Sequence, residues 1–307
     1  MIISASRRTD IPAFYFDWFT NRLKEGYVLV PNPRNAGRLG KVELSAQNVD
    51  CIVFWTKNPA PMLNRISELD AMGYSYYIQF TLTPYDKTAE AFLPPKNELL
   101  RVFAEMSEKV GRKRAVWRYD PVFIDDKYSI GRHIEQFGKM CEKLETYTER
   151  CVISFIDPYK NISSMFKAMT DLEMAAIAAG FSKIAAQHGI SLYTCSEEID
   201  LSDYGIGHSS CIDKNLIEQI IGCPIKAKID ANQRKECRCI ESVDIGAYNT
   251  CTHGCAYCYA TPSKKTTLRL AAEHDPNAPM LTGYPKGSEI ITNRTVLSQK
   301  IGQIKLF

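Results

Sequence analysis

The segment Cys51-Ile-Val-Phe-Trp55 is a short run of apolar side chains, and the polar burst Thr56-Lys-Asn-Pro59 follows it at once. Residues 61–72 then repeat apolar side chains with helical spacing as far as Gly73, and a second apolar run occupies residues 76–82. Runs of this length are typical of buried strands, and glycine enters the left-handed conformation that ends a helix without steric cost. The segment therefore predicts a strand, a helix and a second strand.

The same alternation continues through most of the chain. Further apolar runs of strand length occupy residues 2–6, 114–118, 151–156, 190–195 and 243–248. Helical spacing predicts helices at residues 14–24, 97–110, 130–144, 171–188 and 214–221. Strands that alternate with helices run parallel and are joined by right-handed crossovers. The sequence predicts an α/β fold with a (β/α) barrel-like parallel sheet, TIM-like or partial, and a doubly wound open sheet is the alternative.

The composition is that of a globular protein, since 45% of the 307 residues are hydrophobic and 24% are charged. A formal net charge of +3 is too small to indicate binding to nucleic acid or to a membrane surface. No apolar run is long enough to span a membrane and no signal-peptide pattern opens the chain, so we expect a cytoplasmic protein. We expect one domain at residues 1–260 and a tail at 261–307 that packs on it, in which only a short strand at 289–292 is indicated.

The eleven cysteines are clustered toward one end, which fits reduced thiols and metal binding better than a disulfide framework. Five of them lie within residues 237–260, as Cys237-x-Cys239 followed by Cys251-x3-Cys255-x2-Cys258. Three cysteines with the second spacing can bind one iron–sulfur cubane, whereas proteins that only carry electrons usually supply four. An iron without a protein thiolate can bind a small molecule. The pattern therefore predicts a metal centre at which a reaction takes place.

The segment Asn249-Thr-Cys251-Thr-His-Gly-Cys255-Ala-Tyr257-Cys258 resembles the signature of the radical SAM superfamily, in which an aromatic residue also precedes the last cysteine. The whole chain resembles a bacterial and archaeal family of undescribed function whose C-terminal cysteines are similar to that signature. The resemblance implies a 4Fe-4S cluster that binds S-adenosylmethionine and cleaves it reductively to start radical chemistry. It also implies an electron donor such as a flavodoxin or ferredoxin.

One departure from the superfamily is large, because its cluster loop normally lies near the N-terminus. The resemblance therefore implies a permuted barrel, with the strand at residues 2–6 beside the strand at 243–248. In the superfamily a glycine-rich stretch with an acid binds the amino group of S-adenosylmethionine, and this chain has no Gly-Gly-Glu. As substitutes, the resemblance implies cofactor binding by Ser6, Arg7, Asp10, Asn249 and Tyr257.

Polar side chains follow the predicted strands, where barrels of this kind carry their chemistry. The candidates for catalysis are Tyr119, Asp157, Cys195 and Glu197. The candidates for binding a small-molecule or anionic substrate are Arg8, Lys57, Arg118, Asp120 and His208. A mixed ring of acids and cations suits a zwitterion such as S-adenosylmethionine, and arginine offers a planar fork for carboxylate or phosphate. A thiol such as Cys195 can also donate a hydrogen atom to a carbon radical.

Several alternatives stay open. Cys237 and Cys239 can bind a second metal with Cys211 or Cys223, form a redox pair, or complete the ligand set of the cluster. A zinc knuckle of Cys237, Cys239, Cys255 and Cys258 is the structural alternative, although C-x-C is a tight pair for structural zinc. Two rival functions follow: an iron–sulfur redox or sensor protein without S-adenosylmethionine, and a zinc-stabilised barrel that binds nucleic acid. We read His133, His188 and His274 as surface or helix residues.

Overall fold

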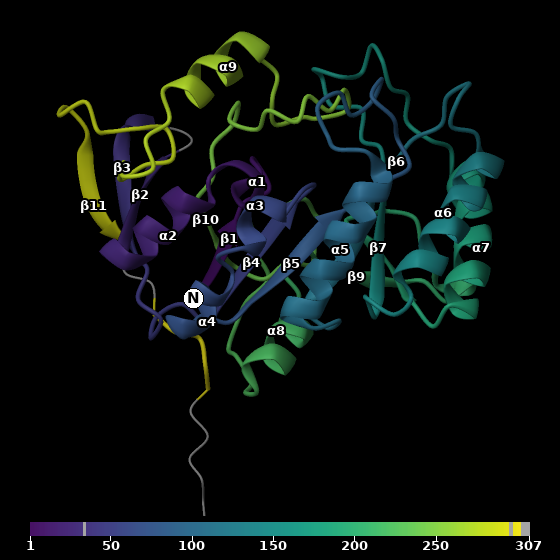
Figure 1. Cartoon of the computed structure of the whole chain (residues 1–307), viewed down its shortest axis with the longest axis horizontal. Helices are drawn as coiled ribbons and strands as arrows, with labels where there is room; N and C mark the ends of the chain where they lie inside the picture. Colours follow the sequence, from purple (N-terminus) through teal and green to yellow (C-terminus); the bar gives the residue numbers. More distant parts are fainter. Residues whose placement is uncertain (33–34, 295–296, 302–307) are drawn as a thin grey trace, which may run out of the picture.

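The computed structural model describes residues 1–32, 35–294 and 297–301. Its centre is an eight-stranded sheet in which every pair of neighbouring strands is parallel (Figure 1). In spatial order the strands are β10 (Val243–Asp244), β1 (Ile2–Ala5), β4 (Cys51–Thr56), β5 (Tyr76–Thr81), β6 (Ala115–Val122), β7 (Arg150–Phe155), β8 (Ser191–Cys195) and β9 (Gly207–Ser209). Helices flank this sheet, so the predicted α/β fold is confirmed.

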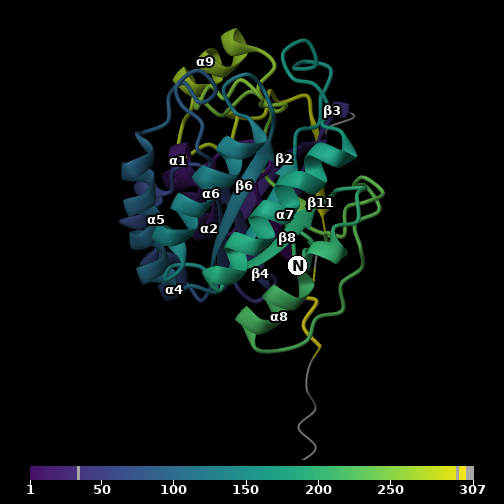
Figure 2. The same ribbon diagram turned by 90° about the vertical axis from the view of Figure 1, so that its right-hand side faces the viewer.

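The strand order decides between the barrel-like and the doubly wound sheet. From β1 to β9 each strand pairs with the next strand of this sheet along the chain, and the direction never reverses. Since parallel crossovers are right-handed, the connecting helices all lie on one face, whereas a doubly wound sheet needs a reversal. These helices are α3 (Ala60–Leu63), α4 (Ser67–Ala71), α5 (Lys96–Val110), α6 (Ile130–Leu144) and α7 (Asp171–Gln187). Figure 2 shows α5, α6 and α7 along the same side of the sheet. The sheet is barrel-like and open, because β9 and β10 do not pair within the described residues.

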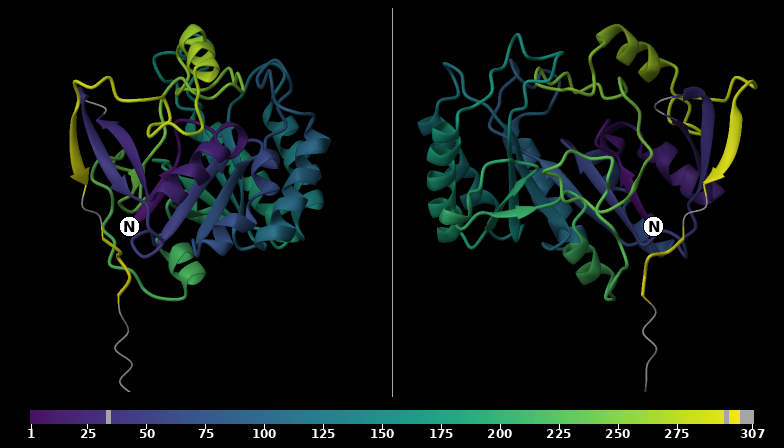
Figure 3. Two further views of the ribbon diagram at one scale, coloured as in Figure 1. Left: turned by 60° about the vertical axis from the view of Figure 1, so that its left-hand side comes forward. Right: turned by 180° about the vertical axis from the view of Figure 1, so that it is seen from behind.

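Two apolar layers follow from the alternation of side chains along each strand. Phe54, Ile78 and Trp117 belong to the large core under the helices. Their neighbours on the same strands, such as Val53 and Val116, pack on the opposite face together with Leu216 and Ile217 of α8 (Lys214–Ile221). The green segment that carries α8 lies across this second face (Figure 3, right). The inner face of the sheet is therefore covered by the chain that leads to the cysteine loop.

A second sheet of three strands was not predicted. It consists of β2 (Tyr27–Asn32), β3 (Asn35–Glu43) and β11 (Ile290–Arg294), with β2 antiparallel and β11 parallel to β3. The remaining helices are α1 (Ile11–Phe14), α2 (Phe16–Glu25), the 3-10 helix η1 (Ser202–Tyr204) and α9 (Lys264–Ala272). The strand indicated at residues 289–292 is confirmed by β11, which packs the tail against an N-terminal hairpin.

The predicted helices at residues 130–144 and 214–221 agree with α6 and α8, but the helix predicted at 61–72 is divided into α3 and α4. The strand predicted at 243–248 is only two residues long. Its side chain at Asp244 accepts a hydrogen bond from the backbone N–H of Gly246 (3.0 Å), which turns the chain away from the ladder. None of the helices in the described ranges has the length and apolar composition needed to cross a bilayer.

The loop after β10 passes so close to the end of β1 that Gly246 cannot be replaced without movement. An added Cβ would lie 2.2 Å from Ser6 Oγ and 2.4 Å from Ser6 Cβ. We expect Gly246→Ala to lower the free energy of unfolding by about 1–3 kcal/mol, measured by urea denaturation, because it overpacks this contact. As a control, a Cβ at Gly131 in α6 meets no atom within 4 Å, and Gly131→Ala should be neutral or stabilising. Equal stability of the two variants would contradict the close approach.

Candidate functional site

A cavity of about 1550 Å³ opens at the carboxyl ends of the strands and continues along the inner face of the sheet. It brings together most of the residues that the sequence singled out. Those that line it are Ser6, Arg7, Arg8, Asp10, Lys57, Arg118, Asp120, Asp157, Cys195, Cys211, Cys237, Cys251, Cys255, Tyr257 and Cys258. The cysteine loop and the polar strand ends therefore share one cavity, although up to about 250 residues separate them in the chain.

Tyr119 lies in the helix-side core instead of the cavity. Because side chains alternate along β6, Arg118 points to the inner face and Tyr119 points toward the helices. The Tyr119 hydroxyl is 2.8 Å from Nδ1 of His133, and the Tyr119 ring packs edge-on against Phe181. His133 is on α6 as expected, but it is only 1% exposed, and its Nε2 lies 2.8 Å from the carbonyl oxygen of Phe123. It is a core residue and not a surface residue.

Four further residues that the sequence singled out also lie outside the cavity lining: Glu197, His208, Cys239 and Asn249. His208 is on β9, where its Nδ1 is 3.0 Å from the hydroxyl of Thr194. Asn249 has a φ of 56°, and its side-chain oxygen accepts a hydrogen bond from the backbone N–H of Ser263 (2.8 Å). Asn249 therefore shapes the start of the cysteine loop and is held by the segment that follows that loop.

The cysteine loop is fastened to the segment between β5 and α5. The backbone N–H of Phe92 donates to the carbonyl of His253 (3.1 Å), and the N–H of Ala256 donates to that of Ala89 (2.8 Å). Gly254 has a φ of 69°, and a Cβ there would lie 2.7 Å from the Phe92 ring. Burial raises the pKa of the Cys255 thiol to about 12, although the neighbouring Lys57 lowers it. These contacts hold the loop against the segment that precedes α5.

The donor set of the loop fits a cluster with three thiolate ligands. Cys251, Cys255 and Cys258 are free, partly exposed and directed to the same cavity. The described part of the chain contains no group of three or more His, Cys, Asp or Glu side chains placed to hold a single metal ion. A cubane binds each thiolate through a different iron, so its ligands lie further apart than those of a single ion.

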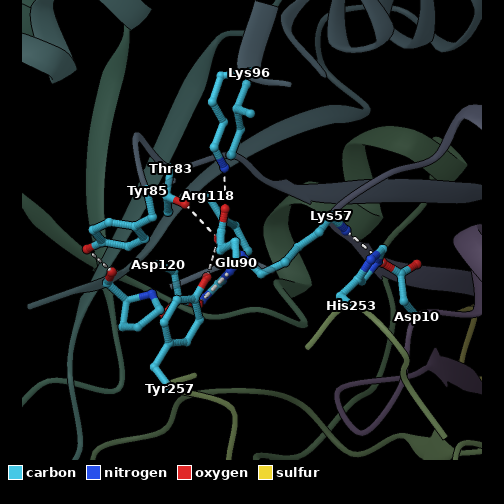
Figure 4. Close-up of polar contacts among 12 residues, drawn as sticks. Asp10, Lys57, Thr83, Tyr85, Glu90, Lys96, Arg118, Asp120, His253 and Tyr257 are labelled. Atoms are coloured by element: carbon cyan, nitrogen blue, oxygen red, sulfur yellow. Dashed lines mark hydrogen bonds and ion pairs between the residues drawn. The ribbon is translucent and has the colours of Figure 1, made fainter. Parts of the chain in front are cut away.

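Asp10 connects three parts of the site (Figure 4). One carboxylate oxygen accepts from the backbone N–H of Ala13 (3.0 Å) and caps α1. The other accepts from the backbone N–H of Lys57 (2.7 Å) and lies 2.8 Å from Nε2 of His253. Asp10 is 4% exposed. In the structure Asp10 holds the cysteine loop in place through His253. Its binding to the amino group of S-adenosylmethionine stays a prediction.

Glu90 was missed by the sequence analysis, although it is the centre of a buried polar network (Figure 4). It is 1% exposed, and one oxygen accepts hydrogen bonds from Lys57 Nζ (2.8 Å), Thr83 Oγ1 (2.9 Å) and the Tyr257 hydroxyl. The other oxygen accepts from Lys96 Nζ. Burial opposes ionisation, but Lys57 and Lys96 outweigh it and lower the pKa of Glu90 to about 2. No motif in the sequence marks this position.

Arg118 is a buried cation at the centre of the inner face. It is 4% exposed, and its guanidinium donates to Oδ2 of Asp120 through Nε (3.1 Å) and Nη2 (2.5 Å). Its Nη1 donates to Gln79 Oε1 (3.0 Å) and to Cys211 Sγ (3.1 Å). Arg118 and Asp120 are therefore next to each other in the cavity, as predicted for the strand ends, and their mutual pairing partly neutralises both.

Cys237 and Cys239 lie beside Cys211 and not beside the cysteine loop. The thiol of Cys239 interacts with the thiols of Cys211 and Cys237, and the backbone N–H of Ile212 donates to Cys239 Sγ (3.4 Å). The sulfur of Cys195 is 3.0 Å from that of Cys211. This arrangement does not assemble the four ligands of the zinc knuckle, two of which belong to the cysteine loop.

Glu197 stands behind the cavity wall. It accepts hydrogen bonds from Ser154 Oγ and from the backbone N–H of Phe155, each at 2.9 Å. Burial raises its pKa to about 7, and the nearby Asp157 adds to the rise, although the two hydrogen bonds oppose it. A carboxyl group with this pKa can exchange a proton near neutral pH.

Comparison with known proteins gives a family and little more. A family model described as "Domain of unknown function (DUF1848)" matches residues 2–260. No curated protein matches the chain. Among solved structures, an alpha-L-fucosidase candidate from Bacteroides thetaiotaomicron is 13% identical, with a TM-score of 0.28. The similarity covers 52% of this chain and 66% of that one. This score is too low to support an argument about fold or activity.

We expect Glu90→Gln to lower the free energy of unfolding at pH 7 by about 3–5 kcal/mol, because it leaves two lysines without their buried counter-charge. The contribution of Glu90 is complete above its unfolded pKa of about 4.5 and is lost as the pH falls toward about 2. Urea denaturation between pH 7 and pH 3 should therefore show a flatter pH dependence in the variant.

The control for this prediction is Glu135→Gln, which removes an exposed pair with Lys139 on α6 and should change stability little. A Glu90→Gln protein as stable as the Glu135→Gln protein would contradict the assigned network.

We expect Glu197→Gln to remove a loss of stability that the wild type shows as the pH rises. The raised pKa means that folding favours the protonated acid, so its contribution is complete below about 4.5 and disappears as the pH rises through about 7. The melting temperature measured from pH 5 to 8 should fall less in Glu197→Gln than in the wild type. Glu198→Gln, at the exposed neighbouring position, should follow the wild type, and parallel curves for all three proteins would refute the prediction.

Proposed function

We propose that this chain, which belongs to the family described as "Domain of unknown function (DUF1848)", is an enzyme of the radical SAM type. In this proposal Cys251, Cys255 and Cys258 hold a 4Fe-4S cluster, and the cavity binds S-adenosylmethionine and a small substrate. The observation that carries it is the position of these three thiols, which line the same cavity as the polar strand ends. When bound, the cluster and S-adenosylmethionine supply a carbon radical that can remove a hydrogen atom from a substrate.

The chain itself supplies a rigid support for the cysteine loop. On one side His253 lies 2.8 Å from the carboxylate of Asp10, which also accepts the N–H of Lys57. On the other side the Tyr257 hydroxyl donates to Glu90. Ligands that are held by such contacts need little rearrangement to bind. The two contacts thus fix the loop from β1 and β4 on one side and from the segment after β5 on the other.

The cavity has charges of both signs, which supports a zwitterionic or anionic occupant. Arg7 uses one donor on Gln233 (3.0 Å) and lies 5.5 Å from the centre of the Trp55 ring, so other guanidinium donors can face a ligand. Arg8 lies over the ring of Tyr248 at 5.2 Å. A guanidinium can bind a carboxylate or phosphate through two parallel hydrogen bonds. We assign the carboxylate of S-adenosylmethionine or an anionic substrate group to this pair of arginines.

The rival readings predict different properties. A sensor protein needs a fourth protein ligand on the cluster, but Cys237 and Cys239 are engaged with Cys211. Replacing both Cys237 and Cys239 by alanine should therefore leave the cluster at the cysteine loop in place under our proposal. In the sensor protein it should abolish that cluster. A zinc-stabilised nucleic-acid-binding barrel predicts a colourless protein whose binding weakens steeply with salt.

We expect the anaerobically reconstituted protein, reduced with dithionite, to change its EPR signal when S-adenosylmethionine is added and to release 5'-deoxyadenosine. Cys255→Ala should abolish both effects and lower the iron content by roughly four atoms per chain, since a cubane needs all three thiolates. Cys223→Ala is the matched control, because Cys223 is a free, partly exposed cysteine outside the cavity lining. An unchanged EPR signal together with no deoxyadenosine in the wild type would reject the proposal.

A further inference from the structure

Four buried cysteines gather on the inner face of the sheet, separate from the cysteine loop. They come from three parts of the chain: Cys195 ends β8, Cys211 follows β9, and Cys237 and Cys239 precede β10. Their exposed fractions are 6%, 7%, 8% and 0%. The first two sulfurs are 3.0 Å apart, and the thiol of Cys239 interacts with those of Cys211 and Cys237. The four sulfurs therefore form a continuous row.

The groups around this row include donors and cations, together with the carboxylate of Asp120 that pairs with Arg118. The backbone N–H of Ile212 points to Cys239 Sγ (3.4 Å), and the guanidinium of Arg118 donates to Cys211 Sγ (3.1 Å). The guanidinium of Arg7 is within electrostatic reach of Cys211, Cys237 and Cys239. A neutral thiol is a weak acceptor, whereas an anionic sulfur accepts strong, charge-assisted hydrogen bonds. The surroundings are suited to sulfurs that carry negative charge.

The backbone that carries these cysteines is held in place by the sheet. The carbonyl of Cys211 accepts hydrogen bonds from the Tyr77 hydroxyl (2.5 Å) and from Gln79 Nε2 (2.9 Å). The N–H of Ile240 donates to the carbonyl of Ile212 (3.2 Å), which ties the Cys237–Cys239 segment to the Cys211 segment. The four side chains are therefore brought together by the fold and not by a flexible loop.

We propose that Cys195, Cys211, Cys237 and Cys239 are the four ligands of a second metal centre, which takes a thiophilic metal, either iron in an iron–sulfur cluster or zinc. Four sulfur ligands are typical of these two metals. Four anionic sulfurs this close repel one another strongly, and a metal cation at their centre offsets that repulsion. As they stand, the four thiols lie in a row and are not among any group of described side chains arranged around a single metal ion, so their side chains have to turn about χ1 to surround a metal.

The two cysteine groups differ in the number of ligands. The cysteine loop offers three thiols, which leaves a position for a small molecule, whereas the row offers four and closes its centre. A closed centre transfers electrons or stabilises the fold but does not bind substrate. Because Cys195 is then a ligand, it is not the hydrogen-atom donor that its place at a strand end suggested.

The test uses the full chain with Cys251→Ser, Cys255→Ser and Cys258→Ser, which removes the first site and makes the result independent of the proposed function. After anaerobic reconstitution with iron and sulfide, or loading with zinc, we expect roughly four irons and four sulfides, or one zinc, per chain. Metal analysis, sulfide analysis and Mössbauer spectra distinguish the two metals. Adding Cys211→Ser and Cys239→Ser should abolish metal binding, whereas adding Cys223→Ser should not.

Circular dichroism of each variant shows whether it is folded. If the five-serine variant does not fold, the triple variant alone still provides the test, since the cysteine loop is removed in it and roughly four irons or one zinc per chain must then be bound elsewhere. Two results would overturn the proposal. One is a folded triple variant that holds neither iron nor zinc after reconstitution. The other is a disulfide between Cys195 and Cys211 in protein isolated without oxygen.

Discussion

The parallel pairing of β1 with β10 is the contact on which the site depends. It joins Ile3 to Val243 and Ser4 to Asp244, residues about 240 positions apart in the chain. The carboxylate of Asp244 strengthens it by accepting hydrogen bonds from the hydroxyls of Ser4 (2.9 Å) and Ser6 (2.6 Å). Because β10 has only two residues, these side-chain bonds add to a short backbone ladder and to the burial of Val243 and Ile245. Together with the contact between His253 and Asp10, they hold the cysteine loop beside the N-terminal strand.

The order of the strands explains why the cavity lies on one face of the sheet. Since the sheet is wound in one direction, the connecting helices cover one face and leave the other to the segment between β9 and β10. That segment carries Cys211, Cys237 and Cys239, and the loop after it carries three further cysteines. A doubly wound sheet would cover both faces with helices. Because the sheet is wound in one direction, cysteines of this segment and of the cysteine loop can line the same cavity.

The sequence predicted the parts of the fold that local pattern determines. The alternation of apolar runs with helical segments gave the large sheet, and helices with strong periodicity, such as residues 130–144, were predicted correctly. The hairpin of β2 and β3 was missed because Pro31 and a polar stretch break its pattern. The direction of individual side chains was not predicted either. Arg118 and Tyr119 both follow an apolar run, but because side chains alternate along the strand, only Arg118 lies in the cavity.

The polar network around Glu90 shows why a site of this kind cannot be read from motifs alone. A carboxylate that is 1% exposed is costly unless its partners are complete, and here two lysines, a threonine and a tyrosine supply them. Thr83 and Lys96 lie within seven residues of Glu90, but Lys57 and Tyr257 come from distant parts of the chain, so local spacing does not reveal the network. Apolar residues of similar volume would often be as stable as such a buried ion pair. What the buried charge of Glu90 adds is a directional contact, because its carboxylate accepts the Tyr257 hydroxyl and so holds the cysteine loop at one position.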